Sequence, residues 1–258
     1  MAIYKGNKKV VAVYKGSTPI NKIYKGGNLV FQKSGGGGST HLFEGTATGN
    51  FNMKVNNQTI PITPDADGKW FYDTDDKITN LESSFYNQKE VTSVDLSNLD
   101  LTGISTNIMF YAATNITSIK FNNTKIMKLQ DVNSMFRSCS SLVSLNLSSF
   151  DTSNLQSVDY LFAGSSKLVS LDLSNWNTSN LTSADYLFNG CTSLKTLDLS
   201  NFDMSKATSY SGMFNYCTSL STIKCKQAFK DWCITNQDKI LLPTAMREGG
   251  SGTWEIIG

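Results

Sequence analysis

Histidine is nearly absent from this chain, which has 258 residues and one histidine, His41. A zinc site of Cys and His ligands and a nucleophile–His–acid triad both need imidazole, and a single histidine beside a glycine-rich stretch is poorly placed for either. Cys225 and Cys233 also lack the spacing of zinc ligands. No phosphate-binding glycine motif follows a strand-like segment. We therefore expect no enzyme, no metal and no cofactor.

Long apolar runs are also missing. No window approaches the roughly 18 apolar residues that a transmembrane helix requires. The first residues, MAIYKGNKKVVAVYKG, contain no continuous apolar segment of the kind found in secretory signals. We expect no membrane insertion. For an extracellular role, either the protein leaves its cell without the general export route or its signal has been removed.

The five cysteines do not suggest a disulfide framework. Cys139, Cys191 and Cys217 each lie three residues after a Phe, at a position held elsewhere by Ala113 and Ser165. We expect free core thiols, because unpaired cysteine behaves as a small hydrophobe. A bridge between Cys191 and Cys217 stays open as an alternative under oxidation. With a buried thiol, a serine at 191 is expected to cost roughly 1–3 kcal/mol as an unpaired hydroxyl.

What the chain has in abundance is repetition. A Phe that follows Met or Leu returns every 26 residues at Phe110, Phe136, Phe162, Phe188 and Phe214, and Phe85 starts the series with a spacing one residue shorter. A fixed period of this length predicts a solenoid, in which each unit is too small to bury its apolar face alone and stacks on its neighbours.

Each repeat also carries a strand-like segment, of which LVSLNLSSF at 142–150 is one copy. The pattern L-x-x-L-x-L turns its leucines into the core and leaves the letters between them exposed, so it predicts one short parallel strand per repeat. The opposite side, SVDYLFAG at 157–164, begins with Ser and holds an apolar pair. That composition predicts a capped helical turn or two.

The unit MF/LF…C-x-S-L-x-x-L-x-L-S-x-F-D-T-S-N, best seen in residues 135–216, resembles the BspA-type leucine-rich repeat of bacterial surface proteins. The resemblance covers about residues 81–226. It implies an α/β solenoid of short parallel strands and short helices. It also implies an extracellular binding or adhesion protein rather than an enzyme, of a kind widespread in gut bacteria and their phages.

The ends of the repeat array look different from the array itself. We expect residues 41–80 to form a cap of two β-hairpins over the first repeat of the solenoid, residues 81–226. The sequence pattern of residues 227–258 predicts a C-terminal cap with a helix, a glycine-rich turn and a final strand. SGGGGS within residues 34–40 is a flexible linker by composition, either natural or introduced.

Residues 1–33 contain a second repeat. Tyr-Lys-Gly recurs every ten residues and predicts a small antiparallel β meander that acts as an adaptor. Its repeated residues are Tyr4, Lys5, Tyr14, Lys15, Tyr24 and Lys25. The segment has seven lysines and no acid; since the chain's formal net charge is +2, the rest carries −5. These lysines either protect strand edges, bind an acidic protein or hold nucleic acid. The repeats resemble short modules of phage structural proteins.

The outward letters of the predicted strands form parallel rows of short polar side chains. Such a lattice suits an extended glycan or protein, although Ser and Thr on a merely solvated sheet give the same pattern. Tyr160 and Tyr186 on the opposite side serve either as a sugar-stacking platform or as ordinary packing. The candidate binding residues are Ser144, Asn146, Tyr160, Ser170, Asp172, Tyr186, Thr196 and Asp198.

These observations lead to three functional hypotheses. The first is a phage virion protein, a homo-oligomeric fibre or decoration subunit on the virion surface, which binds other virion proteins through residues 1–33 and a host-surface glycan or protein through the solenoid. The second is a BspA-like adhesin on the bacterial cell surface. The third is a cytoplasmic scaffold that binds nucleic acid through the lysine-rich N-terminus.

Overall fold

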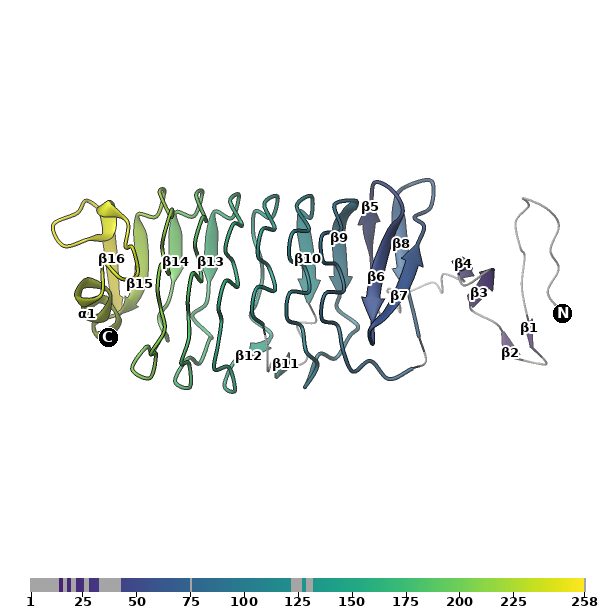
Figure 1. Cartoon of the computed structure of the whole chain (residues 1–258), viewed down its shortest axis with the longest axis horizontal. Coiled ribbons are helices and arrows are strands. Elements are labelled where there is room, and N and C mark those ends of the chain that lie inside the picture. Colours follow the sequence, from purple (N-terminus) through teal and green to yellow (C-terminus); the bar gives the residue numbers. More distant parts are fainter. Residues whose placement is uncertain are drawn as a thin grey trace.

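The computed structural model describes residues 43–257 except 75, 122–126 and 129–131, together with four short strands between residues 14 and 32. The strands and helices of residues 43–257 are β5 (Phe43–Ala47), β6 (Phe51–Val55), β7 (Gln58–Ile62), β8 (Lys69–Tyr72), β9 (Val91–Leu96), β10 (Ser118–Phe121), β11 (Met127–Lys128), β12 (Phe150–Asp151), β13 (Ser170–Asp172), β14 (Thr196–Asp198), β15 (Thr222–Lys226), α1 (Gln227–Thr235), the 3-10 helix η1 (Thr244–Met246) and β16 (Thr253–Ile257). From β9 onward the chain forms a row of coils that lie side by side along the long axis (Figure 1).

Neighbouring coils pair strand to strand in parallel. Leu171 of β13 lies opposite Leu197 of β14, which lies opposite Ile223 of β15, so each step is one 26-residue repeat. The pair β9–β10 shows the same arrangement, with Val94 opposite Ile119. In both sheets the paired apolar residues are buried and the polar letters between them face out. The predicted parallel strands and their inward leucines are therefore present.

A column of phenylalanine rings runs through the centre of the coils. The six repeating Phe residues are fully buried, and successive rings are stacked with centroids 5.2–5.9 Å apart and planes within 13° of parallel. Parallel strands are spaced at about 4.7–4.9 Å, so a ring of each coil reaches its neighbour with little room between them. Equal spacing along the sequence thus becomes direct contact in the core.

The side opposite the strands consists of tight turns. In the coil at 158–165, the N–H groups of Tyr160, Phe162 and Gly164 donate to carbonyls of the next coil at 2.6–3.0 Å, while the N–H groups between them donate to the carbonyl three residues earlier. Tyr160 and Gly164 have left-handed backbones, with φ of +57° and +75°. The same two positions are left-handed in all six coils, at Ser83, Asn87, Ile108, Ala112, Ser134, Ser138, Tyr160, Gly164, Tyr186, Gly190, Gly212 and Tyr216.

The expectation of short helices on this side is therefore wrong for the described coils. An α-helix needs consecutive right-handed residues and keeps its N–H groups for its own carbonyls. Here alternate N–H groups bond to the neighbouring coil instead. Turns replace helices because they let the coils hydrogen-bond to each other on both sides, and α1 is the α-helix of the described residues.

The cysteine position of the repeat holds a hydrogen-bond donor. All five cysteines are free and buried, which agrees with the expectation of core thiols. The Sγ of Cys191 donates to the carbonyl of Phe162 in the preceding coil at 3.1 Å, and Cys139 and Cys217 repeat this contact. Ser165 occupies the same position, and its hydroxyl donates to the Phe136 carbonyl at 2.8 Å. The site therefore accepts either a thiol or a hydroxyl.

The N-terminal cap covers the first ring of the column. Its hairpin β6–β7 turns at Asn56 and Asn57, whose φ values of 50° and 64° suit a two-residue turn. Phe51 of this hairpin and Trp70 of β8 both contact the ring of Phe85. β5 pairs with β8 and with β9. The β6–β7 hairpin is therefore inserted in the chain between the paired strands β5 and β8, whereas the sequence predicts two successive hairpins.

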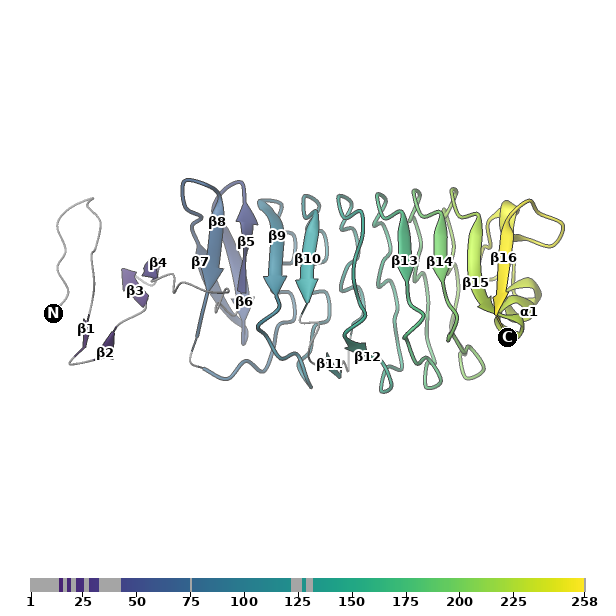
Figure 2. The ribbon, with the colours of Figure 1, turned by 180° about the vertical axis from the view of Figure 1, so that it is seen from behind.

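The C-terminal cap closes the other end (Figure 2). The N–H of Phe214 donates to the carbonyl of Ile240 at 2.9 Å, so the segment after α1 lies where a further coil would lie. Phe229 and Cys233 of α1 are buried, and β16 extends the parallel sheet by one strand beyond β15. The predicted helix and final strand are both present in residues 227–257.

The adaptor falls mostly outside the described residues. Its strands β1 (Tyr14–Lys15) and β2 (Thr18–Pro19) form one antiparallel pair, and β3 (Lys22–Lys25) and β4 (Asn28–Gln32) form another. Tyr4, Lys5, the linker at 34–40 and His41 lie outside the described residues. Among those that are described, no helix is long and apolar enough to cross a membrane.

The left-handed positions give a first prediction. A Cβ at Gly164 would lie 3.1 Å from the Ser138 hydroxyl oxygen, so Gly164→Ala should destabilise the fold by about 1–2 kcal/mol, the cost of left-handed backbone for an L-residue. Ala112 holds the equivalent position with φ +59°. Ala112→Gly should leave the free energy of unfolding unchanged or raise it by up to about 1 kcal/mol. Urea unfolding checks both, and equal losses in the two variants would contradict this account.

The cysteine position gives a second prediction and revises the cost expected for a serine. In Cys191→Ser the hydroxyl takes over the bond to the Phe162 carbonyl, so stability should stay within about 1 kcal/mol of the parent. Cys191→Val should cost about 1–3 kcal/mol, because it loses the donor and overfills a closed core. Thermal melts of the two variants provide the comparison. A serine variant less stable than the valine variant would show that the carbonyl contact is not used.

Candidate binding face

The outward side of the parallel strands presents columns of polar side chains along the long axis. One column consists of hydroxyl residues, one per coil, and ends on β16. Its members are Ser93, Ser118, Ser144, Ser170, Thr196, Thr222 and Thr253. The next column, two residues further along each strand, is charged or amidic. Its members are Asp95, Lys120, Asn146, Asp172, Asp198, Lys224 and Glu255.

At the C-terminal end this face is hollowed into a shallow depression of about 260 Å³. Four of the predicted binding residues line it, and the last two strands add the rest. The polar lining residues are Ser170, Asp172, Thr196, Asp198, Thr222, Lys224 and Glu255. Because β13, β14, β15 and β16 are in register, hydroxyls lie beside hydroxyls and charges beside charges.

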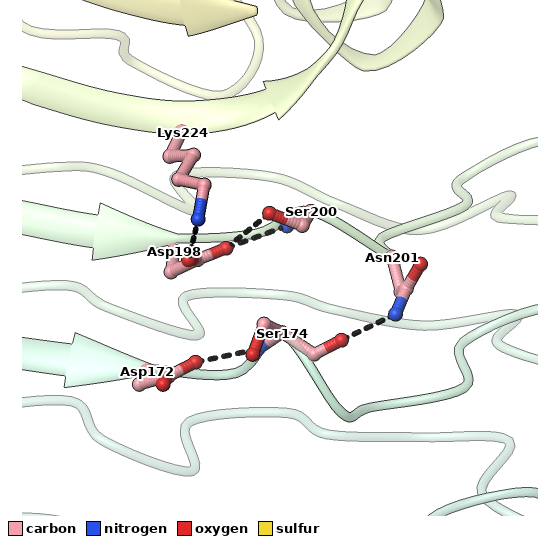
Figure 3. A network of polar contacts seen from close by, with 6 residues as sticks. All are labelled: Asp172, Ser174, Asp198, Ser200, Asn201 and Lys224. Atoms are coloured by element: carbon pink, nitrogen blue, oxygen red, sulfur yellow. Dashed lines mark hydrogen bonds and ion pairs between the residues drawn. The ribbon is translucent and has the colours of Figure 1, made fainter. Parts of the chain in front are cut away.

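The aspartates of this face also shape the turns that follow their strands. Asp172 Oδ1 accepts the N–H of Ser174 at 2.9 Å, and Asp198 Oδ1 accepts the N–H of Ser200 at 3.1 Å (Figure 3). These are Asx-turns, in which the side chain takes the part of a backbone carbonyl. Asn146 does the same for Ser148. In each aspartate, Oδ1 therefore accepts a backbone hydrogen bond within the turn. The second oxygen of Asp198 lies beside Lys224.

One ion pair lies inside the depression. Lys224 Nζ lies 3.0 Å from Asp198 Oδ2 (Figure 3). Burial acts to raise the pKa of Asp198, but the hydrogen bonds from Ser200 and Lys224 outweigh it, and the pKa lies below its ordinary value. The hydrogen bond to Asp198 raises the pKa of Lys224. Asp172 and Glu255 flank this pair, so the depression presents a carboxylate on each side of a neutralised centre.

Two of the predicted strand-face residues lie outside the depression. Ser144 and Asn146 are exposed and belong to the same columns, but their coil forms no strand between 142 and 147. The coil still stacks on its neighbour, since the N–H of Val169 donates to the carbonyl of Val143 at 3.1 Å. Sequence reasoning missed Lys224 as the ion-pair partner of Asp198 and Glu255 as a lining residue of the depression. The alternation of side chains in TWEII was the sequence signal for Glu255. It places Glu255 on the outer face only once β16 is known to lie beside β15.

The two tyrosines lie on the turn side, and their ring faces are already covered. Tyr160 stacks on Tyr186 with centroids 5.0 Å apart and planes 14° apart. The guanidinium of Arg137 lies 4.5 Å from the other face of Tyr160. Gly212 packs against Tyr186, where a Cβ would come within 2.5 Å of the ring. A sugar stacks on an open aromatic face, so this pair is packing and not a sugar-stacking platform.

Comparison with protein families gives one match, in two overlapping placements. Residues 48–168 and residues 104–232 both match the family described as "Mycoplasma protein of unknown function, DUF285". Together the placements span well over half of the chain. The chain belongs to this family. No curated protein and no solved structure matches it.

The overlap of the two placements has a structural explanation. Because one coil resembles the next, the DUF285 pattern fits the chain in more than one register. Both placements include the Phe column from Phe110 to Phe162 and the turn positions between those rings. What the family match covers is thus the stacking pattern, together with β9 in the first placement and β13, β14 and β15 in the second.

Within the described part of this DUF285 chain, no three His, Cys, Asp or Glu side chains come together as a metal site. The thiols are buried, and desolvation raises the pKa of Cys191 to about 12. The aspartates accept backbone N–H groups instead of facing one another across a cleft. The arrangement therefore offers hydrogen bonds and charge along a surface.

The shifted aspartates predict a pH dependence of stability. Asp198 and Asp203 have pKa values below the ordinary 3.8, so their stabilising contribution is complete above that value and is lost as the pH falls through the folded-state pKa. The free energy of unfolding should fall as acid is added below about pH 4. In Asp198→Asn the free energy of unfolding should fall less steeply with acid. In the double variant Asp198→Asn/Asp203→Asn it should fall less steeply again. Urea titrations at several pH values test this, and parallel slopes would contradict it.

Proposed function

We propose that this chain is a non-enzymatic phage virion-associated protein, a fibre or decoration subunit, that displays a BspA-like leucine-rich-repeat solenoid on the virion surface. The solenoid binds a glycan or protein of the host surface. Residues 1–33 attach it to other virion proteins, and the protein acts as a homo-oligomer. The observation that carries the binding role is the polar strand face with its depression.

The chemistry of that face supports a long ligand with repeated polar groups. Hydroxyls recur once per strand, at about 5 Å, which is close to the length of one sugar in an extended polysaccharide. Each exposed hydrogen bond contributes only about 0.5–1.5 kcal/mol, so recognition requires several coils at once. The central ion pair of Lys224 and Asp198 leaves Asp172 and Glu255 available for donors of the ligand.

The virion setting is supported by the N-terminal Tyr-Lys-Gly repeats and their resemblance to phage structural modules. Seven lysines without an acid in residues 1–33 suit a docking partner of opposite charge.

A second candidate is an adhesin on the bacterial cell surface. The family description refers to proteins of Mycoplasma, which favours a bacterial protein, and the polar face supports adhesion equally well. The two candidates differ in where the protein is found. Mass spectrometry of purified phage particles and of washed cell surfaces separates them. Detection on cells and absence from particles would overturn the virion proposal.

The binding role is tested with variants that keep the fold. Asp172→Asn retains the Oδ1 acceptor for the Ser174 N–H and removes the charge, and Thr196→Val retains the shape of a strand residue and removes the hydroxyl. Each change should weaken binding to host cells or their purified glycans by about two- to tenfold, the equivalent of one hydrogen bond. The double variant should weaken binding by more than tenfold.

Asp203→Asn is the matched control. Asp203 also accepts a backbone N–H, from Ser205 at 2.8 Å, but it does not line the depression. Its binding should equal that of the parent protein, measured by flow cytometry with labelled protein on host cells. Equal binding by Asp172→Asn/Thr196→Val and the parent would show that recognition does not use this part of the strand face.

A further inference from the structure

The last strand of the parallel sheet has an open edge. β16 pairs with β15 over all five of its residues, and within the described residues no strand pairs with its other side. The N–H of Thr253 donates to the carbonyl of Ser221 at 2.7 Å. In a parallel ladder alternate residues bond to opposite neighbours, so the N–H and C=O groups of Trp254 and Ile256 point to the open edge.

The edge lacks the features that usually prevent strand addition. Natural edge strands carry Lys or Pro, contain a bulge or are covered by another segment. β16 has the sequence TWEII, and its register with β15 is continuous. Ile256 is 43% exposed. The edge therefore combines unpaired backbone groups with exposed apolar surface.

A groove of about 600 Å³ lies beside this strand. Lys230 and Ile234 of α1 form one wall, the glycine-rich segment 247–252 forms the other, and Trp254 lines the groove between them. The indole N–H of Trp254 donates to the Met246 carbonyl at 3.2 Å, which fixes the ring. A sheet edge beside a helix is an arrangement that receives an extended peptide as an added strand.

We propose that β16 receives a strand from residues 1–33 of a second copy of this chain. Charge complementarity selects this occupant. Asp231, Glu248 and Glu255 lie along the groove and the edge, while Arg247 is already paired with Asp238 at 2.7 Å. Carboxylates therefore outnumber unpaired amines here, and the N-terminal segment offers seven lysines and no acid.

The side-chain pattern of the N-terminal repeats fits the two sides of β16. In a strand, successive side chains point to opposite faces. A strand added to β16 from one of the triplets Ile3–Lys5, Val13–Lys15 or Ile23–Lys25 would therefore carry its tyrosine on one face and its aliphatic residue and lysine on the other. The tyrosine then lies on the side of Trp254 and Ile256, and the lysine lies beside Glu255. This assignment rests on the adaptor role given to residues 1–33 above.

Such a contact joins different surfaces of the two copies. An interface of this type is heterologous and produces either a closed ring or an open chain of subunits. The association should therefore depend on protein concentration, and it should weaken with added salt because lysine and carboxylate charges are screened.

Sedimentation of the full-length protein over a range of concentrations and salt tests the assembly. Ile256→Pro removes one outward N–H while leaving the ladder to β15 intact, and it should abolish the oligomer. Glu255→Lys should weaken association by about tenfold, because it places like charges together. Glu82→Lys, an exposed change in the first coil at the other end of the solenoid, is the matched control and should assemble as the parent does.

The inference would be overturned by a parent protein that is monomeric at every concentration, by an Ile256→Pro variant that folds and assembles normally, or by a Glu255→Lys variant that assembles as well as Glu82→Lys. A photo-crosslinking residue at position 255 should capture a peptide from residues 1–33, and capture of any other segment also contradicts it. Thermal melts report whether Ile256→Pro folds; if it does not, Glu255→Lys and the crosslink decide. Host-cell binding by a monomeric Ile256→Pro variant, whose changed residue does not line the strand-face depression, would leave the proposed function standing while the assembly fails.

Discussion

The fold depends on contact between identical positions of successive repeats. A phenylalanine ring of each coil lies against the ring of the next at 5.2–5.9 Å, and the coils are held at that distance by backbone hydrogen bonds on both sides. Dispersion between stacked rings is small for one pair and large for a continuous column. A break in the period would separate a ring from its neighbour and a carbonyl from its donor at the same time.

The polar residues follow the same rule as the apolar ones. Asp159 Oδ1 accepts the backbone N–H of Asp185 and the hydroxyl of Ser183 in the next coil, at 2.8 Å and 2.6 Å. Thr178 and Asp203 are joined in both directions across the following step. These half-buried polar groups are thereby satisfied by the neighbouring repeat. The strand face is the part of each coil where side chains are not all required for stacking, and it is therefore where binding groups can vary.

Much of the architecture could be predicted from the sequence because it follows from spacing. Phe110, Phe136 and Phe162 recur at a fixed interval, and the leucines around Leu171 alternate with polar letters, so the column, the parallel strands and the free thiols follow directly. The turns could not be predicted in the same way. Tyr160, Ile108 and Ser134 adopt left-handed backbones although none is a glycine, because bonds to the adjacent coil hold them there.

The candidate site was predictable only in part, for a related reason. Asp172 and Asp198 were placed on the outer face by alternation, but their turn-forming bonds to Ser174 and Ser200 depend on the local backbone. Whether the rings of Tyr160 and Tyr186 have open faces depends on Arg137 and Gly212, which belong to other coils. Contacts between repeats decide such questions, and a pattern within one repeat does not contain them.

The bonds from Cys191 and Ser165 to the preceding coil show that each repeat offers its neighbour the same donors and acceptors. Insertion or loss of one whole unit would leave the remaining coils with equivalent partners, whereas insertion of a single residue would not. Gene duplication can therefore lengthen or shorten the molecule in steps of about 5 Å. Its reach, and the length of polymer it can span, are adjustable without any change in the packing of its core.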